Sequence, residues 1–115
     1  MEQNFIENEL IILTKQTLDE FFKQENAADL ISLYVFYYYT AKWQKTNQIK
    51  ATTEYTSKGI GMGLGNVRKV KKQLIELGLI EDVEKKDELG KITGHYIKEI
   101  SFIINDLSIS FYIYF

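Results

Sequence analysis

A run of glycines is the first feature of this chain whose spacing suggests chemistry. Residues 59–65 hold four glycines at alternate positions, and backbone N–H groups in glycine-rich loops can bind phosphate. A nucleoside-triphosphate loop closes with Gly-Lys-Ser/Thr, whereas Gly65 is followed here by Asn66 and Val67. A dinucleotide loop follows a strand of a βαβ unit, whereas this run follows a polar, threonine-rich segment. We therefore interpret the run as a turn between two helices.

The residues that could support catalysis are few. His95 is the only histidine and there is no cysteine, so a zinc ion would need carboxylates as its other ligands. No histidine pair at metal-binding spacing and no serine elbow motif is present. Neighbouring carboxylates such as Glu81 and Asp82 are typical of a soluble surface. We expect no enzyme activity, no catalytic residues, no metal ion and no cofactor.

The charged residues are distributed unevenly along the chain. The formal net charge is -2, but residues 1–39 carry -5, residues 40–72 carry +7 and residues 73–115 carry -4. Glu54 is the single acidic residue of the middle block. A concentrated positive block marks a candidate surface for the phosphates of a nucleic acid.

The composition indicates one intracellular domain. The chain has 115 residues, 45% of them hydrophobic, which suits a single domain with its own core. The absence of cysteine excludes disulfide bonds. The acidic first residues lack the pattern of a signal peptide, and no stretch reaches the roughly 20 apolar residues of a membrane helix. We expect a cytoplasmic protein with no membrane partner.

Two helices are predicted in the first half of the chain. Thr17 and Glu20 match a capping box, in which a hydroxyl and a carboxylate bond to backbone N–H groups at a helix start. Asn26 is the expected N-cap of a longer helix over residues 27–43, with Asp29 in its first turn. Apolar and aromatic residues cover most of the circumference of this longer helix. Such a helix belongs at the centre of a fold or at an interface.

The segments on either side of the glycine run differ in character. Residues 47–53 are polar and loop-like, and Thr52 or Thr53 could cap a short helix that reaches Lys58. Residues 66–77 give the most regular helical pattern, and Gly78 stands where a helix commonly ends. At about 100° per residue, one side of this helix is apolar and the other is mostly cationic. The apolar positions are Val67, Val70, Leu74 and Leu77, and the opposite positions are Arg68, Lys69, Lys72 and Glu76.

The last part of the chain has strand patterns. Residues 79–104 predict a hairpin with a turn in residues 87–90. In residues 107–115, apolar side chains alternate with serine and tyrosine, a period of two that is typical of a half-buried strand. This strand could pair with a second chain in a dimer or cover the hairpin of its own chain.

Residues 53–80, with EYTSKGIGMGLGNVRKVKKQLIELGLI within them, resemble the winged helix–turn–helix domain of bacterial transcription regulators and of phage or plasmid replication-initiation proteins. Members of this family carry a short helix, a glycine turn, a recognition helix of the form VRKAxKxLxELGLI, and a two-stranded wing. In this chain Ile60-Gly61 stands at the turn, and Val67-Arg68-Lys69 opens the recognition helix. Residues 90–98 look like the returning strand of the wing.

The resemblance implies an α+β winged helix with three to four helices, a small antiparallel wing and an extra C-terminal strand. We expect one domain over residues 1–115. Residues 1–25 would form an N-terminal strand and helix extension, residues 26–104 the winged-helix core, and residues 105–115 the C-terminal strand. The implied function is binding of double-stranded DNA through a recognition helix in the major groove, in transcription regulation or in replication.

The two-sided helix supports this function independently, because a recognition helix needs an apolar back and a cationic front. Asn66 and Arg68 are the candidates to read base edges, since asparagine pairs with adenine and arginine with guanine. Lys69 and Lys72 share the cationic front with Arg68. His95 would lie on the wing, in solvent or against a phosphate. The residues expected to contact phosphates are Lys42, Lys45, Lys50, Lys58, Lys71, Lys85, Lys86 and Lys91.

A second function class stays open. Winged helices also bind proteins, and the tyrosine-rich helix and the apolar C-terminal strand offer surfaces that a monomer of this size would leave partly exposed. The alternative is therefore a protein-interaction module or a dimerising adaptor that does not bind DNA.

Overall fold

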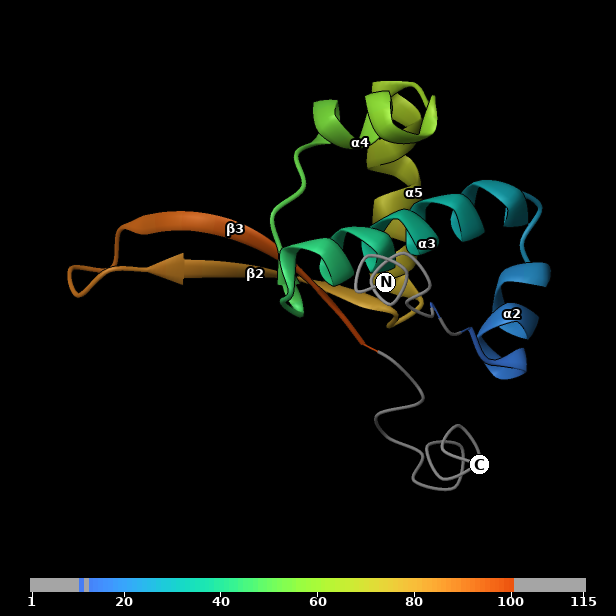
Figure 1. Ribbon diagram of the computed structural model, residues 1–115, viewed down its shortest axis with the longest axis horizontal. Coiled ribbons are helices and arrows are strands. Elements are labelled where there is room, and N and C mark those ends of the chain that lie inside the picture. The colour runs from blue at the N-terminus through green and yellow to red at the C-terminus, as the bar shows by residue number, and fades with distance from the viewer. Residues whose placement is uncertain (1–10, 12, 101–115) are drawn as a thin grey trace, which may run out of the picture.

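The structure, a computed structural model, describes residue 11 and residues 13–100, which form an α+β fold with four helices and a three-stranded antiparallel sheet (Figure 1). The α+β class predicted from the sequence is confirmed. The sheet order is β1-β3-β2, so β3 is the central strand. The elements in chain order are α2 (Lys15–Phe22), α3 (Ala27–Gln44), β1 (Gln48–Ile49), α4 (Thr53–Ile60), α5 (Leu64–Glu76), β2 (Ile80–Lys86) and β3 (Ile92–Glu99).

Helix α3 forms the centre of the helical half and packs against the other helices and β1. One of its faces is buried, as expected for a helix that is apolar almost all round. Tyr34 packs edge-on against Phe21 of α2 with ring centroids 5.4 Å apart. The buried hydrophobic residues are Phe21, Leu30, Leu33, Tyr34, Phe36, Tyr37, Ile49, Met62, Val67, Val70, Leu74, Leu79, Ile80 and Ile97.

The predicted basic helix is present as α5, and its end follows the predicted pattern. Gly78 adopts a left-handed conformation with φ of 76°, which glycine tolerates best. Its N–H donates to the carbonyl of Ile75 at 3.0 Å, and the Leu79 N–H donates to the carbonyl of Leu74 at 3.0 Å. This pair of bonds satisfies carbonyls that a helix end would otherwise leave free.

The turn within the glycine run is shorter than the sequence predicts. Helix α4 continues through Gly59, and α5 already begins at Leu64 and contains Gly65. Only Gly61 of this run has a positive φ, 67°, and it caps α4. A Cβ on Gly59 would lie 2.5 Å from a ring carbon of Phe36, so glycine there permits close packing of α4 on α3. The run therefore serves both packing and turning.

The predicted capping box of the first helix is wrong. Thr14 is the N-cap of α2, and its hydroxyl accepts a hydrogen bond from the Thr17 N–H at 3.1 Å. Thr17 lies inside the helix and is buried, while Glu20 forms an ion pair with Lys23. The position of Asn26 as N-cap of α3 is confirmed, although its side chain makes no capping bond.

The loop predicted over residues 47–53 is also wrong in part, because Gln48 and Ile49 form β1 and pair with β3. Ile49 is buried in the core, and both ends of the Gln44 amide bond to the backbone of Lys50. Thr52 caps α4 as predicted.

The predicted hairpin is confirmed over β2 and β3, which pair from Ile80 with Glu99 to Lys86 with Ile92. Its turn is held by the Asp87 carboxylate, which accepts hydrogen bonds from two backbone N–H groups. The predicted strand over residues 105–115 and the last residues of the predicted hairpin lie outside the described residues, as does most of the predicted N-terminal strand.

Candidate nucleic-acid interface

The two sides of α5 have opposite character, as the sequence predicts. Val67, Val70 and Leu74 are at most 1% exposed and pack into the core. The exposed side chains on the other side are Arg68, Lys69, Lys72 and Glu76. Three cations and one carboxylate thus share a surface whose backbone position is set by buried apolar contacts.

The start of α5 is open to solvent. Its N-cap, Gly63, provides no side-chain bond, and both Gly63 and Gly65 are exposed. A Cβ at either glycine would meet no atom within 4 Å. A phosphate or a base edge can therefore approach the helix backbone closely here, and the positive end of the helix dipole favours a negative group.

Asn66 does not lie on the cationic front. Its amide donates to the Asp29 carboxylate at 3.1 Å, and the Asn66 side chain is half-buried between α5 and α3. About two turns further along α5, the Asn26 side-chain amide donates a hydrogen bond to the Gln73 side-chain oxygen at 2.7 Å. These two polar contacts join the start of α3 to α5 and fix how α5 is rotated.

Lys71 also faces the protein. Its ammonium lies 2.9 Å from a carboxylate oxygen of Asp82, and the lysine side chain is 31% exposed. This ion pair joins α5 to β2, so Lys71 contributes a link between helix and sheet.

The remaining helical and loop lysines lie on other elements. Lys58 is exposed in the last turn of α4. Lys42, Lys45 and Lys50 are exposed around the end of α3 and β1. Lys45 is the left-handed C-cap of α3, with φ of 56°. The basic block of the sequence is therefore spread over several elements, and α5 holds its densest part.

The hairpin carries the other predicted phosphate ligands, and Figure 1 shows it projecting away from the helices. Lys85 lies over the Tyr96 ring, with its ammonium 4.9 Å from the ring centroid. His95 is exposed and pairs across the strands with Glu84. The three exposed lysines, Lys85, Lys86 and Lys91, stand among five exposed carboxylates: Glu81, Asp82, Glu84, Asp87 and Glu88. The predicted site residues therefore fall into a helical group and a hairpin group.

One titratable group that the sequence did not single out is Glu99. It is 9% exposed, and neither of its carboxylate oxygens has a hydrogen-bond partner among the residues that the structure describes. Burial raises the pKa of Glu99 to about 8. Burial also raises the pKa of Tyr34 and of Tyr37, and the nearby Glu99 carboxyl adds to both effects. Glu99 therefore keeps its proton at neutral pH where the hairpin meets the core.

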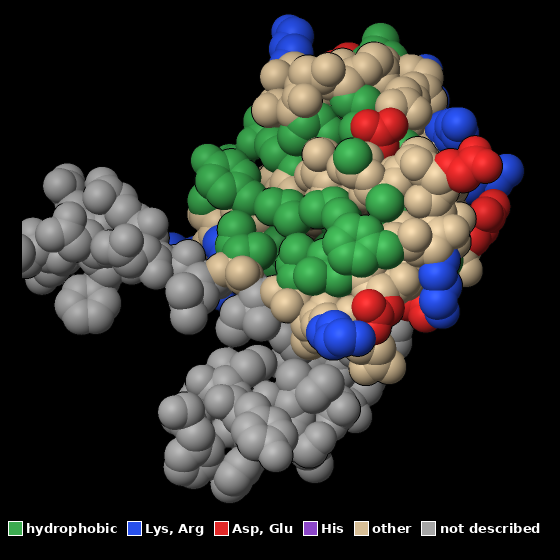
Figure 2. All heavy atoms as spheres, turned by 90° about the vertical axis from the view of Figure 1, so that its right-hand side faces the viewer, with side chains coloured by type: hydrophobic (Ala, Val, Ile, Leu, Met, Phe, Trp, Pro, Cys, Tyr) green, Lys and Arg blue, Asp and Glu red, His purple; other side chains and the backbone are tan. Residues whose placement is uncertain are grey.

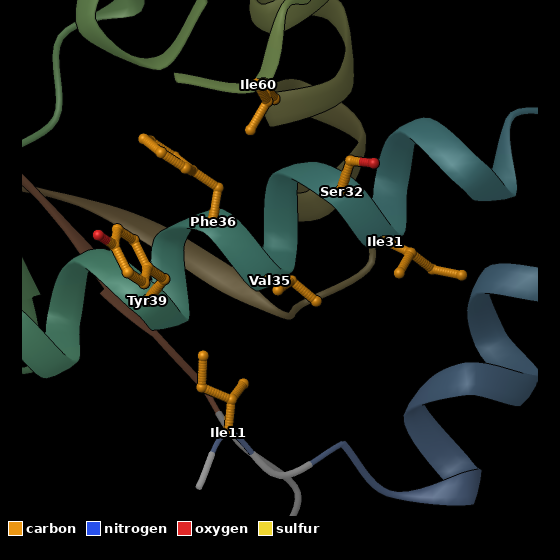
Figure 3. A pocket seen from close by; sticks show the side chains of 7 residues that line it. All are labelled: Ile11, Ile31, Ser32, Val35, Phe36, Tyr39 and Ile60. Atoms are coloured by element: carbon orange, nitrogen blue, oxygen red, sulfur yellow. The ribbon is translucent and has the colours of Figure 1, made fainter. Parts of the chain in front are cut away.

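A second surface, on the outer side of α3, is apolar. A groove of about 530 Å³ is lined by Ile11, Ile31, Ser32, Val35, Phe36, Tyr39 and Ile60 (Figure 3). Figure 2 shows a nearly continuous hydrophobic area on one face of the molecule, with charged side chains toward its margins. Exposed apolar area of this kind commonly marks a contact surface.

Other kinds of site have little support in the described residues. Residue 11 and residues 13–100 contain no group of three or more histidine, aspartate or glutamate side chains placed to hold a metal ion. None of the four helices described combines the length and the apolar character needed to cross a membrane. Comparison with known proteins finds no matching family model, no matching curated protein and no matching solved structure.

Proposed function

We propose that this protein binds double-stranded DNA as a winged helix, with α5 lying in the major groove. The observation that carries the proposal is the division of α5 into a buried apolar side and an exposed side with Arg68, Lys69 and Lys72. A helix with this division can pack on its own domain while its cationic side meets the duplex. The order of elements supports the same assignment, because α4, a glycine turn, α5 and the β2–β3 hairpin follow one another.

The roles within α5 follow from where its side chains lie. Arg68 is the candidate for reading a base, because an exposed guanidinium can donate two hydrogen bonds to guanine. Lys69 and Lys72 would neutralise phosphates on either side of the groove. Asn66 is already bonded to Asp29, so its contribution is to hold the orientation of α5.

The biological role that this activity serves is either transcription regulation or the initiation of replication. Both roles require a protein that recognises duplex DNA, and both are implied by the resemblance of residues 53–80 to the winged helix–turn–helix family.

The test is selection of binding sites from a random duplex pool with the full chain, followed by a salt titration of the selected duplex. Each phosphate neutralised by the protein should give a slope of about 0.9 log units of affinity per log unit of salt. Three to five phosphate contacts would therefore give a slope of about 3 to 5. Failure to enrich any duplex, together with an affinity that does not depend on salt, would contradict the proposal.

The apolar groove on α3 favours a second candidate, a protein-interaction module or dimerising adaptor. In that case the partner would be a protein, and the cations of α5 would only keep the surface hydrated. Substituting Arg68 and Lys72 would then leave partner binding unchanged, whereas placing a charge in the groove would abolish it.

A further inference from the structure

Two opposite sides of α3 are apolar, and only one of them is covered by the core. Leu33 and Tyr37 point into the core and are at most 1% exposed. Ile31, Val35 and Tyr39 recur at every fourth position on the outer side, where they line the groove. The sequence predicts a helix that lies either at the centre of the fold or at an interface. In the structure, one side of α3 is buried in the core and the other side is an exposed apolar surface.

The groove is shallow and open to solvent, with apolar residues on both sides. Ile60 and Phe36 form one wall, and Ile11 approaches from the opposite side (Figure 3). Among the described residues that line it, Ser32 is the one small polar residue and none is charged. Tyr39 is 53% exposed and Ile11 is 37% exposed. Removing such side chains from water is favourable, so a complementary apolar segment would be stabilised here.

We propose that the groove binds residues 107–115 of the same chain. Five apolar side chains alternate in this segment with two serines and two tyrosines, and no residue in it is charged. An extended strand with this pattern presents one apolar face, which suits a groove without charges, and turns its serine and tyrosine side chains to solvent. The apolar positions are Leu107, Ile109, Phe111, Ile113 and Phe115.

The lengths agree with this occupant. Nine extended residues span roughly 30 Å, whereas the α3 positions that line the groove, from Ile31 to Tyr39, span roughly 12 Å, so about four residues of the segment suffice to fill it. The described chain is held at Ile100, whose N–H donates to the carbonyl of Leu79 at 2.8 Å. From there, residues 101–106 provide a connection that can reach roughly 20 Å at most. A tether of this length gives an effective concentration in the millimolar range, which favours the same chain over a second copy.

The test is disulfide crosslinking between introduced cysteines. Because the chain contains no cysteine, an introduced pair can form only one disulfide within the chain. Val35→Cys is combined in the full chain, in turn, with Ile109→Cys, Phe111→Cys and Ile113→Cys. Under mild oxidation, at least one pair should form a disulfide within the chain about tenfold faster than a random-coil tether would give at millimolar effective concentration. Tyr39→Cys serves as a second groove position in case Val35→Cys affects folding.

Two matched controls set the baseline. Val35→Cys with Ser110→Cys tests the opposite face of the segment, and Lys69→Cys with Phe111→Cys tests an exposed position on α5. Crosslinking that is equally fast in the controls would overturn the proposal. A disulfide that forms only between two chains, shown by mixing a Val35→Cys chain with a Phe111→Cys chain, would also overturn it and identify a second copy as the occupant. Neither readout depends on DNA.

Discussion

Helix α5 and the β2–β3 hairpin each expose three cationic side chains, but in different surroundings. On α5 the three cations stand beside one exposed carboxylate, Glu76, whereas the hairpin with its three lysines has five, of which Asp82 is paired with Lys71 of α5. A phosphate responds mainly to the charges that lie within a Debye length of about 8 Å of it. The number of lysines therefore says less about a DNA-binding surface than the balance of charge around each one.

The two regions also differ in how firmly they are held. The exposed side of α5 is backed by Val67, Val70 and Leu74, all in the core, and its rotation is fixed by the bonds of Asn66 and Gln73 to α3. The outer half of the hairpin is exposed on both strands. Positioned groups lose less entropy when they bind, so we expect α5 to dominate duplex affinity.

The largest expected effect comes from removing the α5 cations. Arg68→Ala combined with Lys72→Ala should lower duplex affinity about 100-fold, since a bidentate base contact and a phosphate contact together contribute roughly 3 kcal/mol. Fluorescence anisotropy at fixed salt measures the decrease, and circular dichroism checks the fold. The matched control is Lys15→Ala with Lys23→Ala at the two ends of α2, which removes the same charge from exposed sites. Equal decreases in both variants would mean that only total charge matters.

The second prediction concerns the pH dependence of stability. The side chains that α5 buries carry no titratable group, whereas the hairpin buries Glu99 at its base. The folded protein keeps the Glu99 proton up to a pKa of about 8, but the unfolded chain releases it near 4.5. The folded state thus binds more protons between these values, and stability should fall as pH rises from 5 to 8, by roughly 3 to 4 kcal/mol. Urea unfolding of the wild type and of Glu99→Gln measures this, and the variant should lack that part of the pH dependence. An identical pH dependence in both would show that Glu99 is ionised in the fold.

Helix α5 and strand β1 show which parts of the fold can be predicted from the sequence and which cannot. The apolar period of α5 is long enough to identify the helix and its buried side from sequence alone. Strand β1 has two residues and no pattern, and it exists because β3, about 50 residues later, supplies its partner. The choice of Thr14 over Thr17 as N-cap was likewise settled by the burial of Thr17, which local spacing does not encode.

The candidate site shows the same limit. The cationic side of α5 was predictable, because it depends on a period within one helix. Asn66 and Lys71 were both predicted to meet DNA, yet their partners Asp29 and Asp82 come from α3 and β2. Glu99 reads from the sequence as one more strand carboxylate, and its burial near Tyr34 and Tyr37 follows from tertiary packing. Contacts between elements decided these roles, and no spacing within an element contained them.

A smaller effect distinguishes two roles for Asn66, which could orient α5 or contact a base directly. Asn66→Ala should lower duplex affinity about fivefold if its bond to Asp29 fixes the rotation of α5, since such a bond contributes roughly 1 kcal/mol. Asp29→Ala should then cause a similar decrease, and the double variant should bind little more weakly than either. Anisotropy with the selected duplex and with single-base variants of it measures both affinity and specificity. If Asn66→Ala instead relaxes specificity at one base pair while Asp29→Ala has no effect, Asn66 reads a base directly.

The smallest effect should come from the hairpin lysines. Lys85→Ala, Lys86→Ala and Lys91→Ala together remove as much charge as the whole cationic front of α5, so the triple variant compares the two regions directly. We expect affinity to change by about twofold, because the exposed carboxylates of the same hairpin weaken the attraction of these lysines for phosphate. Glu84→Gln with Glu88→Gln should act in the opposite direction and strengthen binding slightly, as the duplex then meets less repulsion.

A decrease in the triple variant as large as that of the α5 variant would show that the hairpin binds phosphates despite its carboxylates. In that case the salt slope of the triple variant would fall by about one for each phosphate that the hairpin no longer neutralises. The same titration applied to the α5 variant would then show how the phosphates are divided between the two regions, because each region's slope is measured against the same wild-type protein.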